Sequence, residues 1–246
     1  MTGLLWVTVP YVAFTSFFLG HIWRYRHDQF GWTTRSSQLH ESRLLRLGSP
    51  LFHFGLLAVL GGHVMGIAIP ASWTAAFGVT ESDYHLMSAS LGTLSGLATV
   101  AGLGILLYRR ATVTAVRKAT TGIDKIMYTL LTGAIVTGML NTIGSNLIGG
   151  GYNYRATVSP WFRSLFTIHP HPELIAGAPI SFQIHALVVL TLLAIWPYTR
   201  LVHVFSAPLG YLTRPYVVYR SRDINHPGAR RYARAWEVSP PPTPRR

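Results

Sequence analysis

Five long apolar stretches alternate with shorter polar segments along the chain. A helix needs about 20 apolar residues to cross a hydrocarbon core of about 30 Å, and each stretch reaches that length. We therefore predict an all-α membrane protein with five transmembrane helices. The stretches cover residues 4–23, 50–69, 86–108, 126–148 and 180–203.

The segments outside these stretches add two expectations. The loop at 149–179 mixes aromatic residues with prolines, so we expect a short interfacial helix around 159–168, with Trp161 and Phe162 at headgroup level. The first stretch lacks a basic segment before it and a small-residue cleavage site. It is therefore expected to stay as a helix and not to be removed as a signal peptide.

Charge along the chain indicates topology. Only 12% of the residues are charged, about half the share typical of soluble domains. The net charge is +13, but all except two of the 21 lysines and arginines lie in 24–46, in 109–125 and from Arg200 onward. By the positive-inside rule these segments face the cytoplasm, which puts the N-terminus outside and the C-terminus in the cytoplasm. We thus expect membrane lipid as a partner and no nucleic acid.

The C-terminal end of the chain differs from the apolar part. It is basic and finishes in VSPPPTPRR, a proline-rich composition typical of flexible segments. We assign residues 1–215 to a five-helix transmembrane domain and residues 216–246 to a basic, proline-rich cytoplasmic tail.

Histidines are the conspicuous candidates for chemistry. The sequence has no cysteine, which excludes disulfides, cysteine-ligated iron–sulfur clusters and haem attached through a Cys-x-x-Cys-His motif. Apart from His21 at the inner end of the first stretch, four histidines lie within the apolar stretches: His53 and His63 in the second, His185 and His203 in the fifth. An ionisable side chain is costly inside a span and is a functional candidate for that reason.

The depths of these four residues predict how they pair. With a rise of 1.5 Å per residue, His53 lies roughly 5 Å and His63 roughly 20 Å from the inner edge. The fifth stretch runs the other way, so His185 lies roughly 22 Å from that edge and His203 at or just beyond it. His63 is therefore matched with His185, and His53 with His203. Five helical turns separate His185 from His203, so we expect both to face the same way on one helix, with a kink at Pro197.

Two pairs of histidines with no carboxylate suit two six-coordinate haems of the b type, each held by imidazoles on both faces. Zinc or copper would normally need three or four ligands at one level. A proton relay in a transporter or non-redox anchor is the alternative from another class. The glycines of the second span, such as Gly61 and Gly62, are explained equally well by close helix packing and by room for a flat cofactor.

Four segments carry a resemblance to a known family: LFHFGLLAVLGGHVMG, RSSQ, LYRRATVTAVRKATTGID and PYTRLVHVFSAPLGYLTRPY. Over almost its whole length the chain resembles the gamma subunits of membrane-bound respiratory nitrate reductases, which are quinol-oxidising di-haem cytochromes b. The resemblance implies two haem b cofactors in the bacterial plasma (inner) membrane. It implies that His53 and His203 hold the proximal haem, near the cytoplasm, and that His63 and His185 hold the distal haem.

The resemblance also implies a site for menaquinol or ubiquinol beside the distal haem, at Gly62, His63 and the start of the third span. Some members carry a lysine there, whereas this chain reads ESDYHLM. Asp83, Tyr84 and His85 are therefore the candidate polar groups. His85 is favoured because an imidazole can bond the quinol oxygen and accept its proton.

The implied function is oxidation of quinol near the outer face, with electrons passing through the distal and then the proximal haem. They would continue to an iron–sulfur beta subunit and to a molybdenum-containing alpha subunit that reduces nitrate. The chain would thus be the electron-transfer subunit of a quinol:nitrate oxidoreductase. The alternative is a di-haem anchor of a formate dehydrogenase, a hydrogenase or a sulfur-cycle reductase. Arg109, Arg110 and Arg200 are candidates to pair with proximal-haem propionates or a partner subunit, or they mark topology alone.

Overall fold

The computed structural model describes residues 2–33, 35–206 and 213, and it contains helices and no β-strand in that part of the chain. Five of the helices are long and apolar enough to cross a membrane, which confirms the predicted fold class of a multi-pass helical protein. The tail predicted at 216–246 lies outside the described residues. The five candidate spans are Leu4–His27, Arg43–Ala68, Glu81–Thr112, Gly122–Gly144 and Ile180–Tyr198.

The long helices are α1 (Val9–His27), α2 (Arg43–His63), α4 (Glu81–Thr112), α6 (Gly122–Met139) and α9 (Ile180–Ile195). The short helices are α3 (Ala71–Ala76), α5 (Thr114–Lys118), α7 (Val158–Phe166) and α8 (Pro172–Ala176). Segments of π or 3₁₀ geometry are η1 (Leu4–Thr8), η2 (Val64–Ala68), η3 (Leu140–Ile148), η4 (Tyr154–Ala156), η5 (Trp196–Tyr198) and η6 (Arg200–Ser206).

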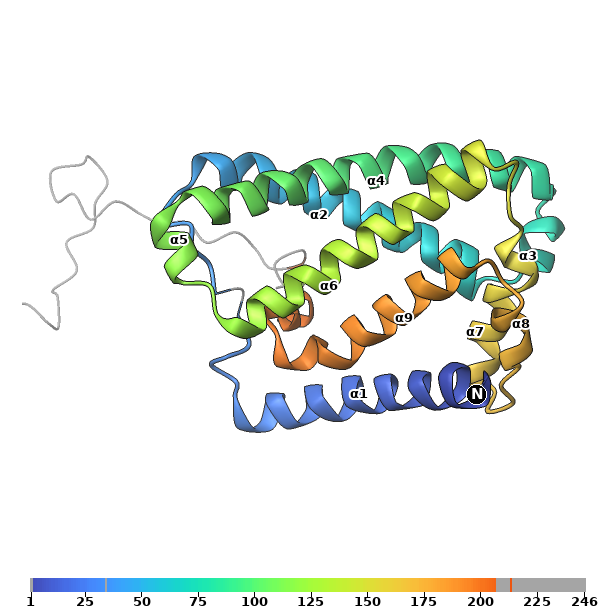
Figure 1. The fold of residues 1–246 in the computed structure, drawn as a ribbon, viewed down its shortest axis with the longest axis horizontal. Helices are drawn as coiled ribbons and strands as arrows, with labels where there is room; N and C mark the ends of the chain where they lie inside the picture. The colour runs from blue at the N-terminus through green and yellow to red at the C-terminus, as the bar shows by residue number, and fades with distance from the viewer. Residues whose placement is uncertain (1, 34, 207–212, 214–246) are drawn as a thin grey trace, which may run out of the picture. The chain divides into compact units, whose positions relative to one another are not determined.

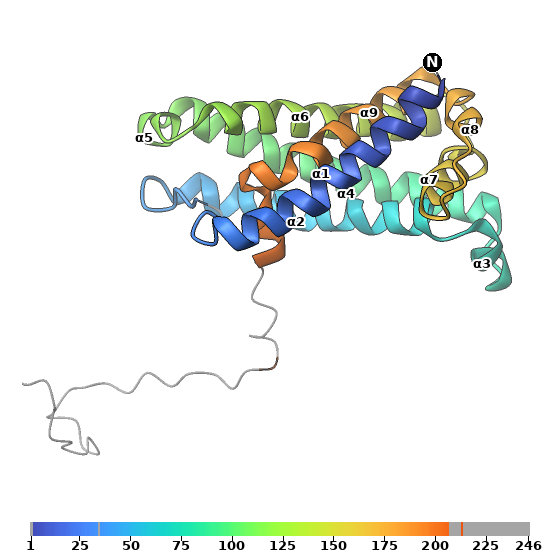
Figure 2. The same cartoon turned by 90° about the horizontal axis from the view of Figure 1, so that it is seen from below.

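The long helices run beside one another, with α3, α7 and α8 gathered at one end and α5 at the other (Figures 1 and 2). α2 packs along α4, and α9 packs between α6 and α1. Glycines allow the close approach of α2 and α4: a Cβ on Gly55 would lie 2.8 Å from the Thr99 backbone nitrogen. A Cβ on Gly102 would collide with the backbone of Phe52. Small residues at such a crossing let two backbones meet in lipid.

Two of the long helices begin with the same local motif. At α4, the Thr80 hydroxyl accepts the Asp83 N–H while the Asp83 carboxylate accepts the Thr80 N–H. Thr121 and Asp124 form the same reciprocal pair at α6. This capping box satisfies N–H groups that a first helical turn leaves unpaired, which fixes where each helix starts.

The fifth span is not the continuous helix expected over 180–203. α9 ends at Ile195, because Pro197 has no N–H to continue the helical hydrogen bonds. Thr199 then takes an extended conformation, with φ −109° and ψ 179°. His203 consequently lies on the 3₁₀ turn η6, and counting five helical turns from His185 was wrong.

The loop before α9 contains the predicted short helix, which the structure places at Val158–Phe166. Trp161 does not lie at the surface of the chain, because this residue is only 3% exposed. Its indole Nε1 donates to the Trp6 carbonyl at 2.9 Å, and the two indole rings meet edge to face. Phe162 is half-buried. The loop is therefore packed into the bundle against the start of the first span.

Candidate functional site

The four histidines predicted as ligands meet in two pairs. The ring centroids of His63 and His185 are 6.1 Å apart, and those of His53 and His203 are also 6.1 Å apart. These are the partners matched by depth in the sequence. We call His63 and His185 the helix pair, because both rings come from α-helices, and His53 and His203 the turn pair, because His203 lies on η6.

The spacing within each pair fits one metal ion held between two imidazoles. A bond from a metal ion to a histidine nitrogen is about 2.0–2.1 Å long, so rings on opposite sides of one ion have centroids about 6 Å apart. The two rings are inclined by 35° in the helix pair and by 72° in the turn pair. Each pair thus offers the two axial nitrogens that a b-type haem requires.

Hydrogen bonds hold all four rings at Nδ1, which leaves Nε2 as the nitrogen available to a metal ion. A carbonyl oxygen only accepts, so the Nδ1 atom beside it must carry the proton, and Nε2 keeps its lone pair. Histidines that bind metals typically donate their other ring N–H in this way. The Nδ1 acceptors are Ser49 O for His53 (2.7 Å), Val59 O for His63 (2.8 Å), Arg200 O for His203 (2.6 Å) and Thr137 Oγ1 for His185 (2.9 Å).

The glycines near the helix pair differ in what surrounds them. A Cβ on Gly61 or Gly62, both exposed, would meet no heavy atom within 4 Å, unlike one on Gly55. Helix packing within this chain therefore explains Gly55 and not Gly61 or Gly62. On the facing helix α6, a Cβ on Gly138 would lie 3.1 Å from His185 Cε1, so this glycine allows the ring its position.

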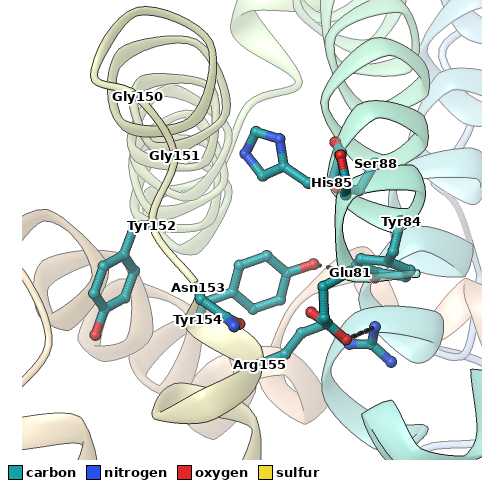
Figure 3. Close-up of a pocket in the computed structure, with 11 residues that line it drawn as sticks. Glu81, Tyr84, His85, Ser88, Gly150, Gly151, Tyr152, Asn153, Tyr154 and Arg155 are labelled. Carbon is teal, nitrogen blue, oxygen red and sulfur yellow. Dashed lines mark hydrogen bonds and ion pairs between the residues drawn. The ribbon is translucent and has the colours of Figure 1, made fainter. Parts of the chain in front are cut away.

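A cavity of about 330 Å³ lies at the end of the bundle where α4 begins (Figure 3). It includes Tyr84 and His85, two residues of the predicted quinol site, but Gly62 and His63 do not line it. Asp83, the third polar candidate, does not line it either, because its carboxylate is engaged with Thr80 in the capping box. The lining residues are Glu81, Ser82, Tyr84, His85 and Ser88 from α4 and Gly150, Gly151, Tyr152, Asn153, Tyr154 and Arg155 from the facing loop.

The cavity lies next to the segment that follows His63 in the chain. A Cβ on Gly66, three residues after His63, would come within 2.8 Å of the Tyr84 hydroxyl and 2.5 Å of the Tyr154 hydroxyl. Three residues are about one helical turn, so the tyrosine hydroxyls lie roughly one turn beyond His63 along the chain. The candidate quinol residues and the helix pair therefore share one end of the bundle.

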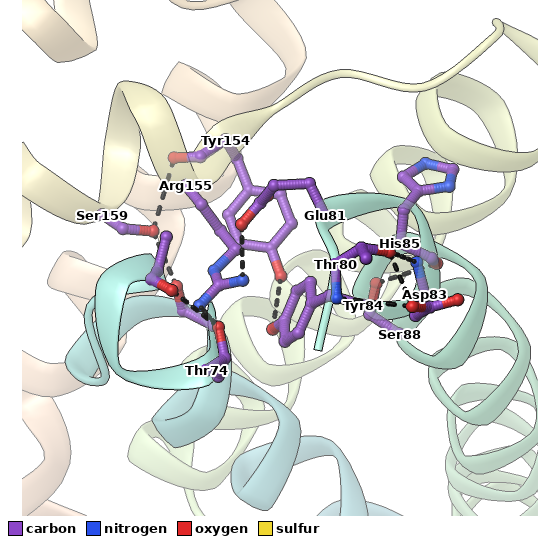
Figure 4. A network of polar contacts seen from close by, with 12 residues as sticks. Thr74, Thr80, Glu81, Asp83, Tyr84, His85, Ser88, Tyr154, Arg155 and Ser159 are labelled. Carbon is purple, nitrogen blue, oxygen red and sulfur yellow. Dashed lines mark hydrogen bonds and ion pairs between the residues drawn. The ribbon is translucent and has the colours of Figure 1, made fainter. Parts of the chain in front are cut away.

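A polar network borders this cavity (Figure 4). The buried Arg155 guanidinium donates to Glu81 Oε1 at 3.0 Å and to Thr74 Oγ1 at 2.9 Å, and it stacks 3.9 Å above the Tyr84 ring. The hydroxyls of Tyr84 and Tyr154 are 3.2 Å apart. Burial raises the pKa of the Tyr154 hydroxyl, which therefore remains neutral and available as a hydrogen-bond donor.

Two buried nitrogens of the cavity have no hydrogen-bond partner among the described residues: His85 Nε2 and Arg155 Nε. Figure 3 shows the His85 ring directed from α4 towards Gly150 and Gly151. Buried polar atoms are normally paired, so an unpaired nitrogen in a cavity is available to a ligand oxygen. A quinol hydroxyl is a group of that kind.

Sequence reasoning missed Tyr154 and Arg155, because no motif marks the loop at 149–179. One signal was available. Arg155 and Arg163 are the two basic residues outside the segments assigned to the cytoplasm. Arg155 is buried in the network, and Arg163 donates to the Ile67 carbonyl at 2.9 Å. Both arginines that depart from the topological pattern are therefore hydrogen-bonded within the fold.

The arginines considered for haem propionates have partners within the chain. The buried Arg109 donates to Glu41 Oε2 at 2.6 Å and to the Ser37 carbonyl at 2.9 Å. Burial would raise the pKa of the Glu41 carboxyl, but hydrogen bonds from the Leu44 N–H and from Arg109 hold that pKa below its usual range. The other two have partners as well: Arg110 donates to Thr120 Oγ1 at 2.6 Å, and Arg200 pairs with Asp124 at 2.6 Å.

Five apolar helices and two pairs of facing histidines define the class of the protein: a multi-pass helical membrane protein with paired imidazoles. Residues 2–222 match the family described as nitrate reductase gamma subunit, so the chain belongs to that family.

Individual relatives agree with this assignment. The chain is 46% identical over 223 residues to the nitrate reductase gamma chain of Bacillus subtilis, which covers 90% of this chain and 100% of that protein. It is 35% identical over 214 residues to the respiratory nitrate reductase 2 gamma chain of Escherichia coli, covering 87% and 94%. It is 55% identical over 224 residues to the nitrate reductase-like protein NarX of Mycobacterium tuberculosis, covering 91% of this chain. The chain spans 34% of the length of NarX.

Proposed function

We propose that this chain is the cytochrome b anchor subunit of a quinol:nitrate oxidoreductase, taking electrons from quinol near the outer face of the bacterial plasma membrane. One observation carries the proposal. The chain holds two pairs of histidines, and the ring centroids within each pair are 6.1 Å apart. Relatives named nitrate reductase gamma chain support the nitrate-linked role.

In this proposal the helix pair and the turn pair each hold one haem b by the free Nε2 atoms of their two rings. The bound haems would supply one-electron carriers at two depths of the membrane. The chain's own contribution is to fix the rings. His63 and His53 donate Nδ1–H to carbonyls of their own helix, and His185 donates to Thr137. Because the accepting oxygens hold each ring at a set angle, the protein determines the orientation of the imidazoles that would bind each haem.

The cavity at the start of α4 is the proposed quinol site. Oxidation of a quinol to a quinone releases two electrons and two protons. His85 Nε2 is placed to accept a proton from one quinol hydroxyl, as a general base does. Tyr84 and Tyr154 supply hydroxyls for the quinol oxygens, and Arg155 holds the Tyr84 ring in place. Glu81, whose side chain is 51% exposed, connects Arg155 to the outside and offers the released proton an acceptor.

The distribution of charge supports the proposed orientation. The cavity lies on the side with few basic residues, which the positive-inside rule assigns to the outside. Protons from quinol would then be released outside, while electrons leave on the cytoplasmic side to an iron–sulfur beta subunit and a molybdenum-containing alpha subunit. Each charge moved across the membrane stores about 2.3 kcal/mol per 100 mV, so the reaction would conserve energy.

The test is quinol-driven haem reduction in membranes that contain the chain with its beta and alpha subunits. We expect a reducible b-type absorption band that menaquinol or ubiquinol analogues reduce and that added nitrate reoxidises. Membranes with the chain alone are the control, in which quinol reduces the band and nitrate has no effect. A chain without a reducible b-type band would overturn the proposal. Reoxidation by another acceptor and not by nitrate would move the chain to a different quinone-linked oxidoreductase.

A further inference from the structure

The turn that carries His203 needs hydrogen-bond donors from elsewhere in the fold. α9 stops at Ile195, and the peptide between Pro197 and Thr199 leaves the helical pattern. Carbonyls released in this way are paired in native structures, because a buried carbonyl without a donor is destabilising. In this protein a side chain of α1 donates to these carbonyls, and a side chain of α6 holds the turn through Arg200.

Arg24 on α1 supplies the first set. This residue is buried, and its Nη1 donates to the carbonyls of Pro197 at 2.6 Å and Thr199 at 2.8 Å. Its Nη2 donates to the Gly31 carbonyl at 2.7 Å. Gly20, one turn earlier on α1, allows the contact: a Cβ there would lie 2.8 Å from Pro197 Cβ. One guanidinium thus binds the carbonyls on both sides of the break.

Asp124 at the start of α6 makes the second contact with the turn, as a hydrogen-bond acceptor. Its carboxylate is fully buried and accepts two hydrogen bonds from Arg200, from Nε at 2.8 Å and from Nη2 at 2.6 Å. The same carboxylate accepts the Thr121 N–H at 3.0 Å in the capping box. A bidentate pair of this geometry fixes the direction as well as the distance of the arginine.

These contacts reach the imidazole through one peptide. The His203 Nδ1–H is donated to the Arg200 carbonyl at 2.6 Å. Arg24 holds the carbonyl of the preceding residue, Thr199, and Asp124 holds the Arg200 side chain. The acceptor that orients the His203 ring is therefore fixed from α1 and from α6, whereas the ring of His53 is oriented by its own helix.

We propose that Arg24 and the ion pair of Asp124 with Arg200 are positioning residues for His203. They hold the turn that brings this ring to 6.1 Å from His53, and so they control the haem of the turn pair and not that of the helix pair. This inference rests on the proposed function, because it assigns a haem to each pair. Loss of a group that orients a metal-binding histidine typically weakens metal retention about 10- to 100-fold.

The test compares two variants with matched controls in the full chain. Arg24→Gln removes the guanidinium, and Arg26→Gln is its control, because Arg26 is an exposed cation on the same helix. Asp124→Asn removes the charge of the pair, and Asp83→Asn is its control, because Asp83 closes the equivalent capping box of α4 without an arginine. The double variant Asp124→Asn with Arg200→Gln replaces the ion pair by two neutral amides, which leaves no buried charge unpaired.

Haem retention and the midpoint potential of each haem are the readouts. We expect Arg24→Gln and Asp124→Asn to lower retention of the turn-pair haem by about tenfold or to shift its potential, with the helix-pair haem unchanged. The double variant should recover part of the loss, and both controls should match the unaltered chain. Equal loss of both haems, or no change in either, would contradict the inference.

A second measurement separates this inference from the proposed function. Hydrogen exchange of residues 199–206 in the haem-free chain reports the turn directly. We expect faster exchange in Arg24→Gln and Asp124→Asn than in the two controls. If the unaltered chain binds no haem, the proposed function fails even though the anchoring of the turn persists. If it binds two haems and exchange at 199–206 is the same in all variants, the positioning role fails.

Discussion

The helix pair and the turn pair have the same ring spacing but are held in place by different means. His63 and His185 lie on regular helices, and their orienting acceptors, Val59 and Thr137, belong to α2 and the neighbouring α6. His203 lies beyond the end of α9, on a turn tied to α1 and α6 by arginines. Helix periodicity is sufficient to place one pair. The other depends on buried side chains far away in sequence.

The difference extends to the angle between the rings. In the helix pair the planes differ by 35°, and in the turn pair by 72°. Axial ligands influence the electronic properties of a haem iron through their identity, hydrogen bonds and orientation. Two haems with identical ligand atoms are thus expected to give distinct spectra and potentials, which makes each pair separately measurable.

Removing one ligand from each pair is the strongest test of the comparison. His63→Ala should abolish the haem of the helix pair and spare that of the turn pair, and His203→Ala should do the reverse. Each variant should contain half the haem of the unaltered chain, with a different remaining spectrum. His169→Ala, an exposed loop histidine, is the control. Helix content measured by circular dichroism checks folding, and loss of both haems from a folded variant would refute separate sites.

We expect a quinol bound in the cavity to reduce the helix-pair haem before the turn-pair haem. His85→Ala should slow quinol-driven haem reduction about 100-fold, because it removes the proposed general base. Haem content and reduction by dithionite should stay unchanged, since His85 orients neither pair. His171→Ala is the matched control, because His171 is exposed and does not line the cavity. Normal quinol-driven reduction in His85→Ala would exclude this residue as the proton acceptor.

The hydroxyl of Thr137 allows a test of how His185 is oriented in the helix pair. It donates to the Gly133 carbonyl at 2.7 Å, so it accepts the proton of His185 Nδ1 at 2.9 Å. Thr137→Val keeps the shape and removes this acceptor, and we expect helix-pair haem to be held about tenfold less tightly. Thr142→Val loses a hydroxyl that, among the described residues, bonds the Gly138 carbonyl and no histidine, and it should have no such effect. Haem transfer to apomyoglobin measures retention, and a change confined to the turn pair would contradict the assignment.

The sequence was sufficient for the parts of the fold that depend on a regular repeat. Hydropathy located five spans, and a constant rise per residue matched His63 with His185 and His53 with His203. Both arguments use averages over 20 residues or more, so an error of a few residues at a helix end changes little. The assignment of these residues as haem ligands stays a prediction.

What the sequence did not reveal depends on single long-range contacts. The end of α9 at Ile195 follows from Pro197, but the position of His203 after it depends on Arg24, which lies 173 residues before the proline. The composition of the loop at 149–179 favoured an interfacial location, whereas Trp161 is buried because its indole finds a carbonyl partner in Trp6. Such partners are specified by the folded arrangement and not by any local pattern.

The smallest expected effect concerns two glycines on α6 that face α9. A Cβ on Gly138 would lie 3.1 Å from His185 Cε1, whereas a Cβ on Gly133 would lie 3.4 Å from Val188 Cγ1, an ordinary contact. Alanine raises helix propensity equally at both positions, so the difference between Gly138→Ala and Gly133→Ala isolates the contact with the imidazole.

We expect Gly138→Ala to weaken retention of the helix-pair haem about fivefold, the effect of mild overpacking, and to shift its potential. Gly133→Ala should leave both haems unchanged, and neither variant should alter the turn pair, because His203 is fixed from α1 and the start of α6. A potentiometric titration of each variant measures the two haems together. If Gly138→Ala moved the turn-pair potential as much as that of the helix pair, the two pairs would be coupled through α6. The separate support described for each pair would then be wrong.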